Sequence, residues 1–262
     1  MEEDDDDQYK QQVLACAFGE SSDSSDDALY PAVKEGEIYS WESVEGIDGL
    51  WLCRDFLPEK HQNLLLSAIH GEGLFTESSY NQAMKFGDLP NWAIDLSRLI
   101  QKAVCYGETI SLDGLESDCK EQQMEESGPL PFDLLWREPL FDQLITNVYK
   151  PGEGISAHVD LLRFEDGIAI VSLESECVMH FSRADQETCS HKAQGGQDGS
   201  LVKIPVLLNP GSLLLIFGEA RYSWKHEINR KEGFQTWKGR EIIQKKRTSV
   251  TLRKLCHSAE DI

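Results

Sequence analysis

Two histidines and one aspartate are the residues of this chain whose types and spacing best suit a metal ion. His158 and Asp160 stand two positions apart in the segment HVD, and residues two apart in an extended chain project to the same face. His226 stands well downstream, in RYSWKHEI. Two imidazoles and a carboxylate on one face of a metal leave three positions open, which is typical of non-haem iron(II) sites, whereas catalytic zinc usually keeps one. The ligand set alone leaves iron and zinc both open.

A pair of arginines favours iron over zinc. The segment RTSVTLR at 247–253 has the alternation of a strand, which turns Arg247 and Arg253 to the same face. Along a strand they are roughly 20 Å apart, at about 3.3 Å per residue, and their long side chains shorten that gap to about the length of a small dicarboxylate. The planar fork of arginine binds carboxylates through two hydrogen bonds. A metal beside two such arginines predicts iron(II) with 2-oxoglutarate as co-substrate.

Three segments follow one another in a recognisable order: TNVYKPGEGISAHVD, GSLLLIFGEARYSWKHEI and RTSVTLR. Together they resemble the AlkB family of iron(II)- and 2-oxoglutarate-dependent dioxygenases. Within that family they are most similar to the branch that contains the AlkB domain of the tRNA wobble-uridine hydroxylase. The resemblance covers about residues 48 to 254 and is strongest from residue 140 onward.

The resemblance implies Fe(II) as the metal, with 2-oxoglutarate and O2 as co-substrates. Asn147 and Tyr149 match the family's N-x-Y, which helps to hold 2-oxoglutarate, and Arg247 matches the arginine that pairs with its distal carboxylate. Arg253 matches a second arginine near the metal end, and Ser249 stands where many members have asparagine. The residues that match the metal ligands, and so the catalytic centre, are His158, Asp160 and His226.

The hydrophobic pattern predicts an α+β domain. Folding is expected to start near Gly49 with a short strand, followed by a helix after Pro58 and a second helix over residues 91–104. From residue 140 onward, short β-rich runs separated by turn residues predict an antiparallel sandwich or barrel. The resemblance makes this a double-stranded β-helix (jelly roll) core with N-terminal helices and a substrate lid. The β-rich runs are LITNVY, IAIVSL, ECVMHFS, KIPVLL, SLLLIF and RTSVTLRKL.

Charge divides the chain into two predicted parts. The net charge is −21, and residues 1–46 alone carry 14 acidic against 2 basic side chains. Residues 1–36 are therefore expected to be a disordered acidic tail, and residues 37–262 to be the AlkB-like oxygenase domain. An acidic body opposes general adhesion to nucleic acid. The basic loop at 225–247 is the local exception.

The first hypothesis for the substrate is a modified nucleobase in tRNA-like RNA or in DNA, which the enzyme would hydroxylate or oxidatively demethylate. The basic loop would contact phosphates, and Phe234 and Trp237 within it could stack on bases. A solvated loop without such a role is the alternative. The segment at 81–92 matches the family's lid. The residues expected to contact substrate are Met84, Phe86, Trp92, Arg221 and Trp237.

Two other functions stay open at this point. An oxygenase that acts on a protein side chain is favoured by the acidic surface. A non-catalytic binding protein would use the acidic tail to hold a partner, and the intact metal and co-substrate residues count against it.

The cysteines and the apolar runs bear on the cellular compartment. Seven scattered cysteines without a CxxC pair indicate a reducing environment. The N-terminus lacks the apolar stretch of a signal peptide, and no apolar run is long enough to span a membrane. We expect an intracellular monomer, in the nucleus or cytoplasm. A zinc site at Cys177, His180, Cys189 and His191 is disfavoured, because the first two would point to opposite faces of a strand.

Overall fold

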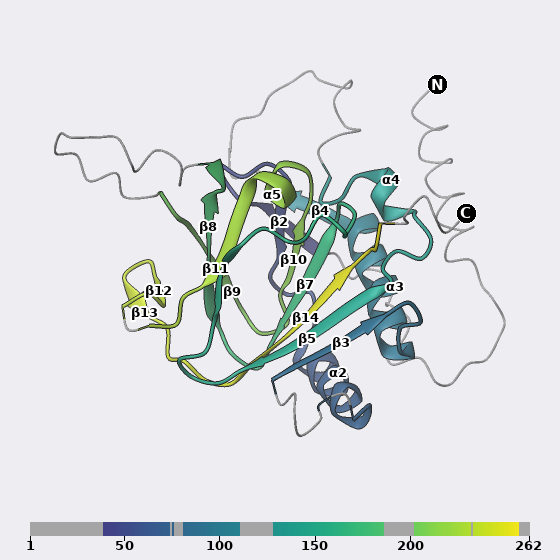
Figure 1. The fold of residues 1–262 in the computed structure, drawn as a ribbon, viewed down its shortest axis with the longest axis horizontal. Coiled ribbons are helices and arrows are strands. Elements are labelled where there is room, and N and C mark those ends of the chain that lie inside the picture. Colours follow the sequence, from purple (N-terminus) through teal and green to yellow (C-terminus); the bar gives the residue numbers. More distant parts are fainter. Residues whose placement is uncertain are drawn as a thin grey trace, which may run out of the picture.

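The computed structural model describes residues 39–73, 75, 81–110, 128–185, 202–231 and 233–256. These residues form two sheets, two longer helices beside the larger sheet, and a small two-stranded hairpin (Figure 1). The predicted acidic tail lies outside the described residues. The arrangement agrees with the predicted α+β class and jelly-roll core. None of the helices in the described part is long and apolar enough to cross a membrane.

The larger sheet has eight strands in the order β3-β5-β14-β7-β10-β2-β1-β4. Neighbouring strands run antiparallel, except for the parallel pair β1 and β4. The bounds of its strands are β1 (Tyr39–Ser43), β2 (Leu50–Cys53), β3 (Gln82–Phe86), β4 (Gly107–Ile110), β5 (Gln143–Tyr149), β7 (Ile168–Leu173), β10 (Leu213–Ile216) and β14 (Arg247–Arg253).

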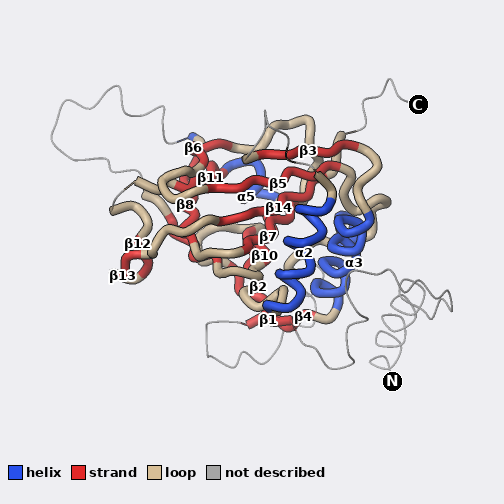
Figure 2. The backbone as a smooth tube through the Cα atoms, turned by 90° about the horizontal axis from the view of Figure 1, so that it is seen from below, coloured by secondary structure: helices blue, strands red, loops and turns tan. Residues whose placement is uncertain are grey.

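Two helices cover one face of this sheet, as Figure 2 shows. They are α2 (Glu59–Gly71) and α3 (Asn91–Cys105), and each begins directly after a proline, whose missing N–H is tolerated at a helix start. The apolar stripe of α3 packs in one core cluster with Val250 and Leu252 of β14. The helix-facing side of β14 is thus apolar, which leaves its opposite face for the arginines. Two short helices, α4 (Phe132–Leu135) and α5 (Gly218–Ser223), complete the helical part that the structure describes.

The smaller sheet has the order β6-β11-β8-β9, with β6 (Ile155–His158), β11 (Trp224–Ile228), β8 (Cys177–Arg183) and β9 (Ile204–Leu208). Along β8, Met179 and Phe181 face inward and join a second core cluster with Ile170 of the larger sheet. Val178, the neighbour of Met179 in the alternation, faces outward and packs instead with Ile242. The hairpin of β12 (Thr236–Trp237) and β13 (Arg240–Glu241) lies on this outer side.

All six predicted β-rich runs are strands in the structure. The expectation that folding starts near Gly49 was wrong, because β1 begins at Tyr39 and pairs with both β2 and β4. The lid segment at 81–92 holds β3, which pairs with β5 along one edge of the larger sheet. The strands β4, β6 and β11 were also not predicted, since their few residues carry little apolar pattern of their own.

Candidate metal and co-substrate site

A bulge between two neighbouring strands brings the two candidate histidines together. His226 of β11 lies directly opposite His158 of β6, whereas Ile228 lies opposite Ile155. Three steps along β6 therefore match two steps along β11, which is the signature of a β-bulge. Without the extra residue, Ile155 and His158 would face opposite sides of the sheet. With it, Ile155 packs against the inner core while His158 stands beside His226.

Asp160 completes a group of three possible metal ligands. One ligand atom from each of His158, Asp160 and His226 lies within 4.8 Å of the other two. The His226 Nε2 is 3.6 Å from the Asp160 Oδ2, and the two imidazole centroids are 4.3 Å apart. Asp160 and His226 are buried, and His158 is half-buried. Within the described residues, this is the group of histidine, cysteine and acidic side chains close enough to share a metal.

The histidines are prepared for coordination by their surroundings. The His158 Nδ1 lies 2.8 Å from the Ser156 carbonyl oxygen, which can only accept, so Nδ1 carries the proton and Nε2 is free for a metal. Burial lowers the pKa of His226 from 6.5 to about 4, against the opposing effect of the Asp160 carboxylate. His226 is therefore neutral at physiological pH, which is the form that binds a metal.

Two arginines hold Asp160 from different sides. The Arg253 guanidinium forms an ion pair with the Asp160 carboxylate. Arg221 donates to the backbone carbonyls of Asp160 at 2.9 Å, Leu161 at 2.8 Å and Phe164 at 3.2 Å. Arg221 is only 2% exposed, so it binds the backbone of this segment from the buried side. This corrects the expectation that Arg221 contacts substrate.

The inner face of β14 fits a dicarboxylate between its two arginines. Arg247 is 1% exposed and donates from Nε to the Ser172 Oγ at 3.0 Å, while its buried Nη2 has no partner among the described residues. At the other end of the strand, the buried Nε of Arg253 also has none. Buried guanidinium donors without acceptors are costly. A co-substrate with a carboxylate at each end, such as 2-oxoglutarate, would satisfy both, so the residues present fit the group.

The neighbouring strand β5 places the N-x-Y residues beside these arginines. In the antiparallel register, Asn147 lies opposite Ser249 and Tyr149 lies opposite Arg247. The Arg247 Cζ lies 5.6 Å from the centroid of the Tyr149 ring. Burial raises the pKa of Tyr149, with Arg247 opposing the shift, so the phenol stays protonated and can donate a hydrogen bond.

Three polar residues that support this site were missed from the sequence. Ser172 holds Arg247, Gln143 accepts from the Arg253 Nη1 at 3.3 Å, and Gln82 donates to the Asn147 Oδ1 at 2.8 Å. The alternation of β5 would have indicated Gln143, which shares a face with Asn147 and Tyr149. Ser172 and Gln82 lie on other strands, and only the register of the sheet reveals them.

Two of the expected substrate residues lie at the open edge of the site. Phe86 of β3 lies opposite Gln143 of β5, which lies opposite Arg253 of β14, so the three share one face of the sheet. Met84 has the same orientation, two residues earlier in β3. Their side chains are 47% and 50% exposed. Contact between these residues and a substrate stays a prediction.

The two tryptophans lie elsewhere. Trp92 is buried in the core cluster between α3 and the far face of the larger sheet. Trp237 packs with Val178, Leu207 and Ile242 on the outer face of the smaller sheet, whereas His226 lies on the inner face. In the basic loop, Arg240 and Lys246 pair with Glu176 and Glu174. The structure therefore separates both tryptophans, and the hairpin that carries Trp237, from the metal ligands.

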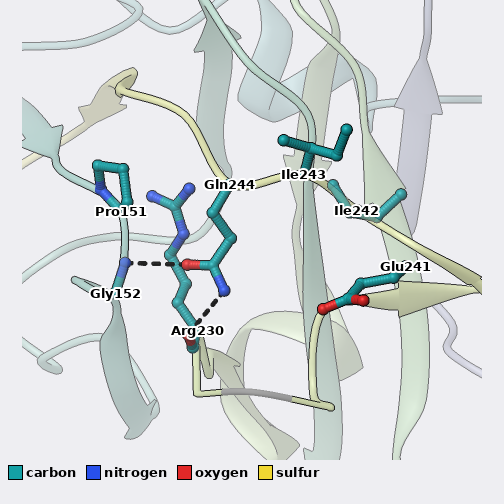
Figure 3. A pocket seen from close by; sticks show the side chains of 7 residues that line it. All are labelled: Pro151, Gly152, Arg230, Glu241, Ile242, Ile243 and Gln244. Atoms are coloured by element: carbon teal, nitrogen blue, oxygen red, sulfur yellow. Dashed lines mark hydrogen bonds between the residues drawn. The ribbon is translucent and has the colours of Figure 1, made fainter.

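A cavity of about 500 Å³ lies between the β5–β6 turn and the end of the basic loop (Figure 3). The amide side chain of Gln244 is engaged with the backbone on both sides of the cavity. The Gly152 N–H donates to the Gln244 Oε1 at 2.9 Å, and the Gln244 Nε2 donates to the Arg230 carbonyl at 2.7 Å. None of the metal ligands lines it. The cavity therefore adds nothing to the metal site.

The alternative zinc cluster has no geometric support. Cys177 faces the inner core, whereas His180 lies opposite Glu227 on the outer face of the smaller sheet. This separation follows from the alternation of β8, as predicted. Cys189 and His191 lie outside the described residues.

Comparison with known proteins places this geometry in a family. The model of the 2OG-Fe(II) oxygenase superfamily matches residues 49–253. An Arabidopsis thaliana protein named "Alkylated DNA repair protein ALKBH8 homolog" is 39% identical over 234 residues, covering 82% of this chain and 60% of the relative. A Xenopus tropicalis "tRNA (carboxymethyluridine(34)-5-O)-methyltransferase alkbh8" is 29% identical over 231 residues, covering 81% of this chain and 32% of the relative.

The chain thus spans less than two thirds of the length of these two relatives. A solved structure titled "The structure of OsALKBH1" aligns with 79% of this chain and 98% of its own, at 14% identity and a TM-score of 0.48. The superfamily match, the ALKBH8-named relatives and the His-Asp-His group beside two arginines agree with one another. The chain belongs to the 2OG-Fe(II) oxygenase superfamily, and within it the chain is similar to the ALKBH8-named relatives.

Proposed function

We propose that this dioxygenase oxidises a modified nucleobase in RNA, by hydroxylating a carbon or by removing an N-methyl group. The observation that supports the proposal is the open edge of the metal site, where an exposed aromatic ring stands on the same face as the metal-side arginine. A flipped or single-stranded base needs such a platform for stacking. The printed names of two relatives, one a DNA repair protein homologue and one a tRNA methyltransferase, support nucleic acid as the substrate class.

The residues of this chain divide the work of the reaction. When bound, iron(II) and 2-oxoglutarate activate O2 for the oxidation of a C–H bond, with succinate and CO2 as co-products. His158, Asp160 and His226 would hold the iron, and Arg253 orients the carboxylate of Asp160 through their ion pair. Arg247 would bind the distal carboxylate of 2-oxoglutarate at the buried end of β14. The inner core excludes water from this end.

A turnover assay tests the proposal. Purified protein is given iron(II), ascorbate, 2-oxoglutarate and total tRNA, and succinate and nucleosides are measured by mass spectrometry. We expect succinate release that rises with RNA, together with a change in the mass of one modified nucleoside. His158→Ala should abolish both, whereas His180→Ala should not, because His180 lies on the outer face of the smaller sheet.

Two results would redirect the proposal. Succinate release that rises with a protein extract and not with RNA would establish the second candidate, a protein side chain, which the net charge of −21 favours. A wild-type protein that matches His158→Ala in turnover and in iron content would instead indicate a non-catalytic binding protein. The compartment in which the enzyme works stays a proposal as well, with the nucleus and cytoplasm as candidates.

A further inference from the structure

An exposed arginine lies at the open edge of the site, between two aromatic rings. The Arg163 Cζ is 5.7 Å from the centroid of the Phe86 ring and 5.0 Å from that of Phe164. Arg253 also lies near the Phe164 ring, with its Cζ 4.9 Å from the ring centroid, and its guanidinium pairs with Asp160. A continuous stack therefore connects β3 with a metal ligand. Guanidinium groups at these distances from an aromatic ring are attracted by it.

The backbone that carries Arg163 is held firmly. Arg221 binds the carbonyls of Asp160, Leu161 and Phe164, on both sides of Arg163. The Arg163 carbonyl itself accepts from the Cys256 N–H at 2.9 Å. The side chain is thus exposed while its attachment is fixed, and a fixed attachment reduces the entropy lost when a ligand binds.

The charge of Arg163 is not neutralised by the described part of the chain. No carboxylate among those residues forms an ion pair with it, although the chain as a whole carries 46 acidic side chains and a net charge of −21. An unpaired cation at the open edge of a site in an acidic protein favours an anionic ligand. Its planar fork suits the two free oxygens of a phosphodiester.

The ring of Phe86 supplies the second half of the contact. It is 47% exposed, and Phe86 shares the metal-side face of the larger sheet with Gln143 and Arg253. One side of the ring is near Arg163, so the exposed part is available to a base. A phosphate contact next to a stacking platform is the arrangement by which proteins hold single-stranded nucleic acid.

We propose that Arg163 binds a phosphate of a single-stranded RNA substrate and that Phe86 stacks on a base beside it, so that the target nucleobase is directed toward the metal. This proposal rests on the proposed function, since it names the residues through which RNA would reach that same site. It places the RNA contact at the open edge of the site and not on the basic hairpin.

The test measures the binding of a short fluorescein-labelled single-stranded RNA by fluorescence anisotropy over a range of salt concentrations. Each protein carries Mn(II) and 2-oxoglutarate, so that the site is filled without turnover. We expect Arg163→Gln to weaken binding about tenfold and to reduce the slope of log Kd against log salt by about 0.7, the value for one phosphate on a single strand. Arg163→Lys should restore the slope, because lysine keeps the charge.

Phe86→Leu should weaken binding about tenfold with an unchanged salt slope, because it removes stacking and no charge. Arg98→Gln is the matched control. Arg98 is an exposed arginine of α3, on the helix-covered side of the larger sheet, and its loss should change neither quantity.

Three results would overturn the proposal, and they are distinguishable. If Arg163→Gln keeps the wild-type affinity and salt slope, Arg163 does not contact the RNA, and the proposed function stands without this contact. A loss that Arg163→Lys does not restore, accompanied by loss of Mn(II), would show that Arg163 only supports the fold. A wild-type protein that binds a fluorescein-labelled polyglutamate peptide and no RNA would end both this proposal and the proposed function.

Discussion

The buried floor of the site and its open edge are built on different principles. On the floor, Asp160 and Arg247 are almost completely buried, and each has a fixed partner in the larger sheet, Asp160 on β14 and Arg247 on β7. At the edge, Met84 and Phe86 are about half exposed and belong to an outer strand. The floor therefore determines which reaction takes place. The edge is where we expect the substrate to be selected, and the predictions below test that division.

The largest effect is expected from loss of a metal ligand on the floor. His226→Ala should reduce RNA-dependent succinate release by more than about 100-fold, because even residues that only orient metal ligands change activity by about 10- to 100-fold. Iron content after anaerobic reconstitution should fall with it. Turnover near the wild-type level in this variant would contradict the assignment of the site, and His180→Ala serves as the matched control.

A large effect is also expected at the far end of the floor. Arg247→Met should raise the KM for 2-oxoglutarate by about 10- to 100-fold, because it removes charge-assisted hydrogen bonds to the distal carboxylate. Iron binding should change much less, since Arg247 stands six residues along β14 from Arg253. An unchanged KM, measured from succinate release at saturating iron, would show that the co-substrate binds elsewhere.

Loss of Arg221 should affect stability and iron binding together. Arg221→Met leaves three carbonyls of the metal-ligand segment without their buried donor, which should lower the free energy of unfolding by about 3 kcal/mol. Urea unfolding measures this, and an iron titration should show weaker binding. Arg98→Met, at an exposed position, should change stability by less than about 0.5 kcal/mol. A stability loss without weaker iron binding would separate Arg221 from the site.

The smallest effect is expected outside the site altogether. The double variant Lys238→Gln, Arg240→Gln should change RNA affinity less than about twofold, because the hairpin lies on the outer face of the smaller sheet and exposed charges are screened beyond about 10 Å. If this variant loses more affinity than Arg163→Gln in the same anisotropy assay, RNA binds to the hairpin, and the open edge loses its proposed role.

The floor of the site was largely predictable from sequence, because each of its parts is local. The HVD segment and the alternation of RTSVTLR indicate two of the candidate metal ligands and both arginines without knowledge of the fold. The bulge in β6 was not predictable, because it exists only relative to β11 and leaves no mark in the sequence ISAH. The position of Trp237 was not predictable for the same reason. Its basic surroundings in the sequence suggested RNA binding, but its place in the fold depends on which face of β8 it packs against.

The edge was predicted in part. The resemblance of their segment to a lid predicts that Met84 and Phe86 contact substrate, which stays a prediction, but it did not predict that they belong to a strand of the main sheet. Arg163 was missed, because a single arginine after HVD has no distinctive spacing. Its position between two rings depends on β3 and on the segment after Asp160 meeting in space.

The position of β3 at the end of the larger sheet has a consequence for redesign. Within the described residues, β3 shares a ladder of hydrogen bonds with β5 and no other strand. Substitutions in β3 can therefore disturb one ladder of hydrogen bonds, whereas substitutions in β14 can disturb two. Libraries confined to residues 84–86, which are exposed, leave the Gln82 contact to Asn147 intact and offer a route to new substrates that spares the oxidising machinery.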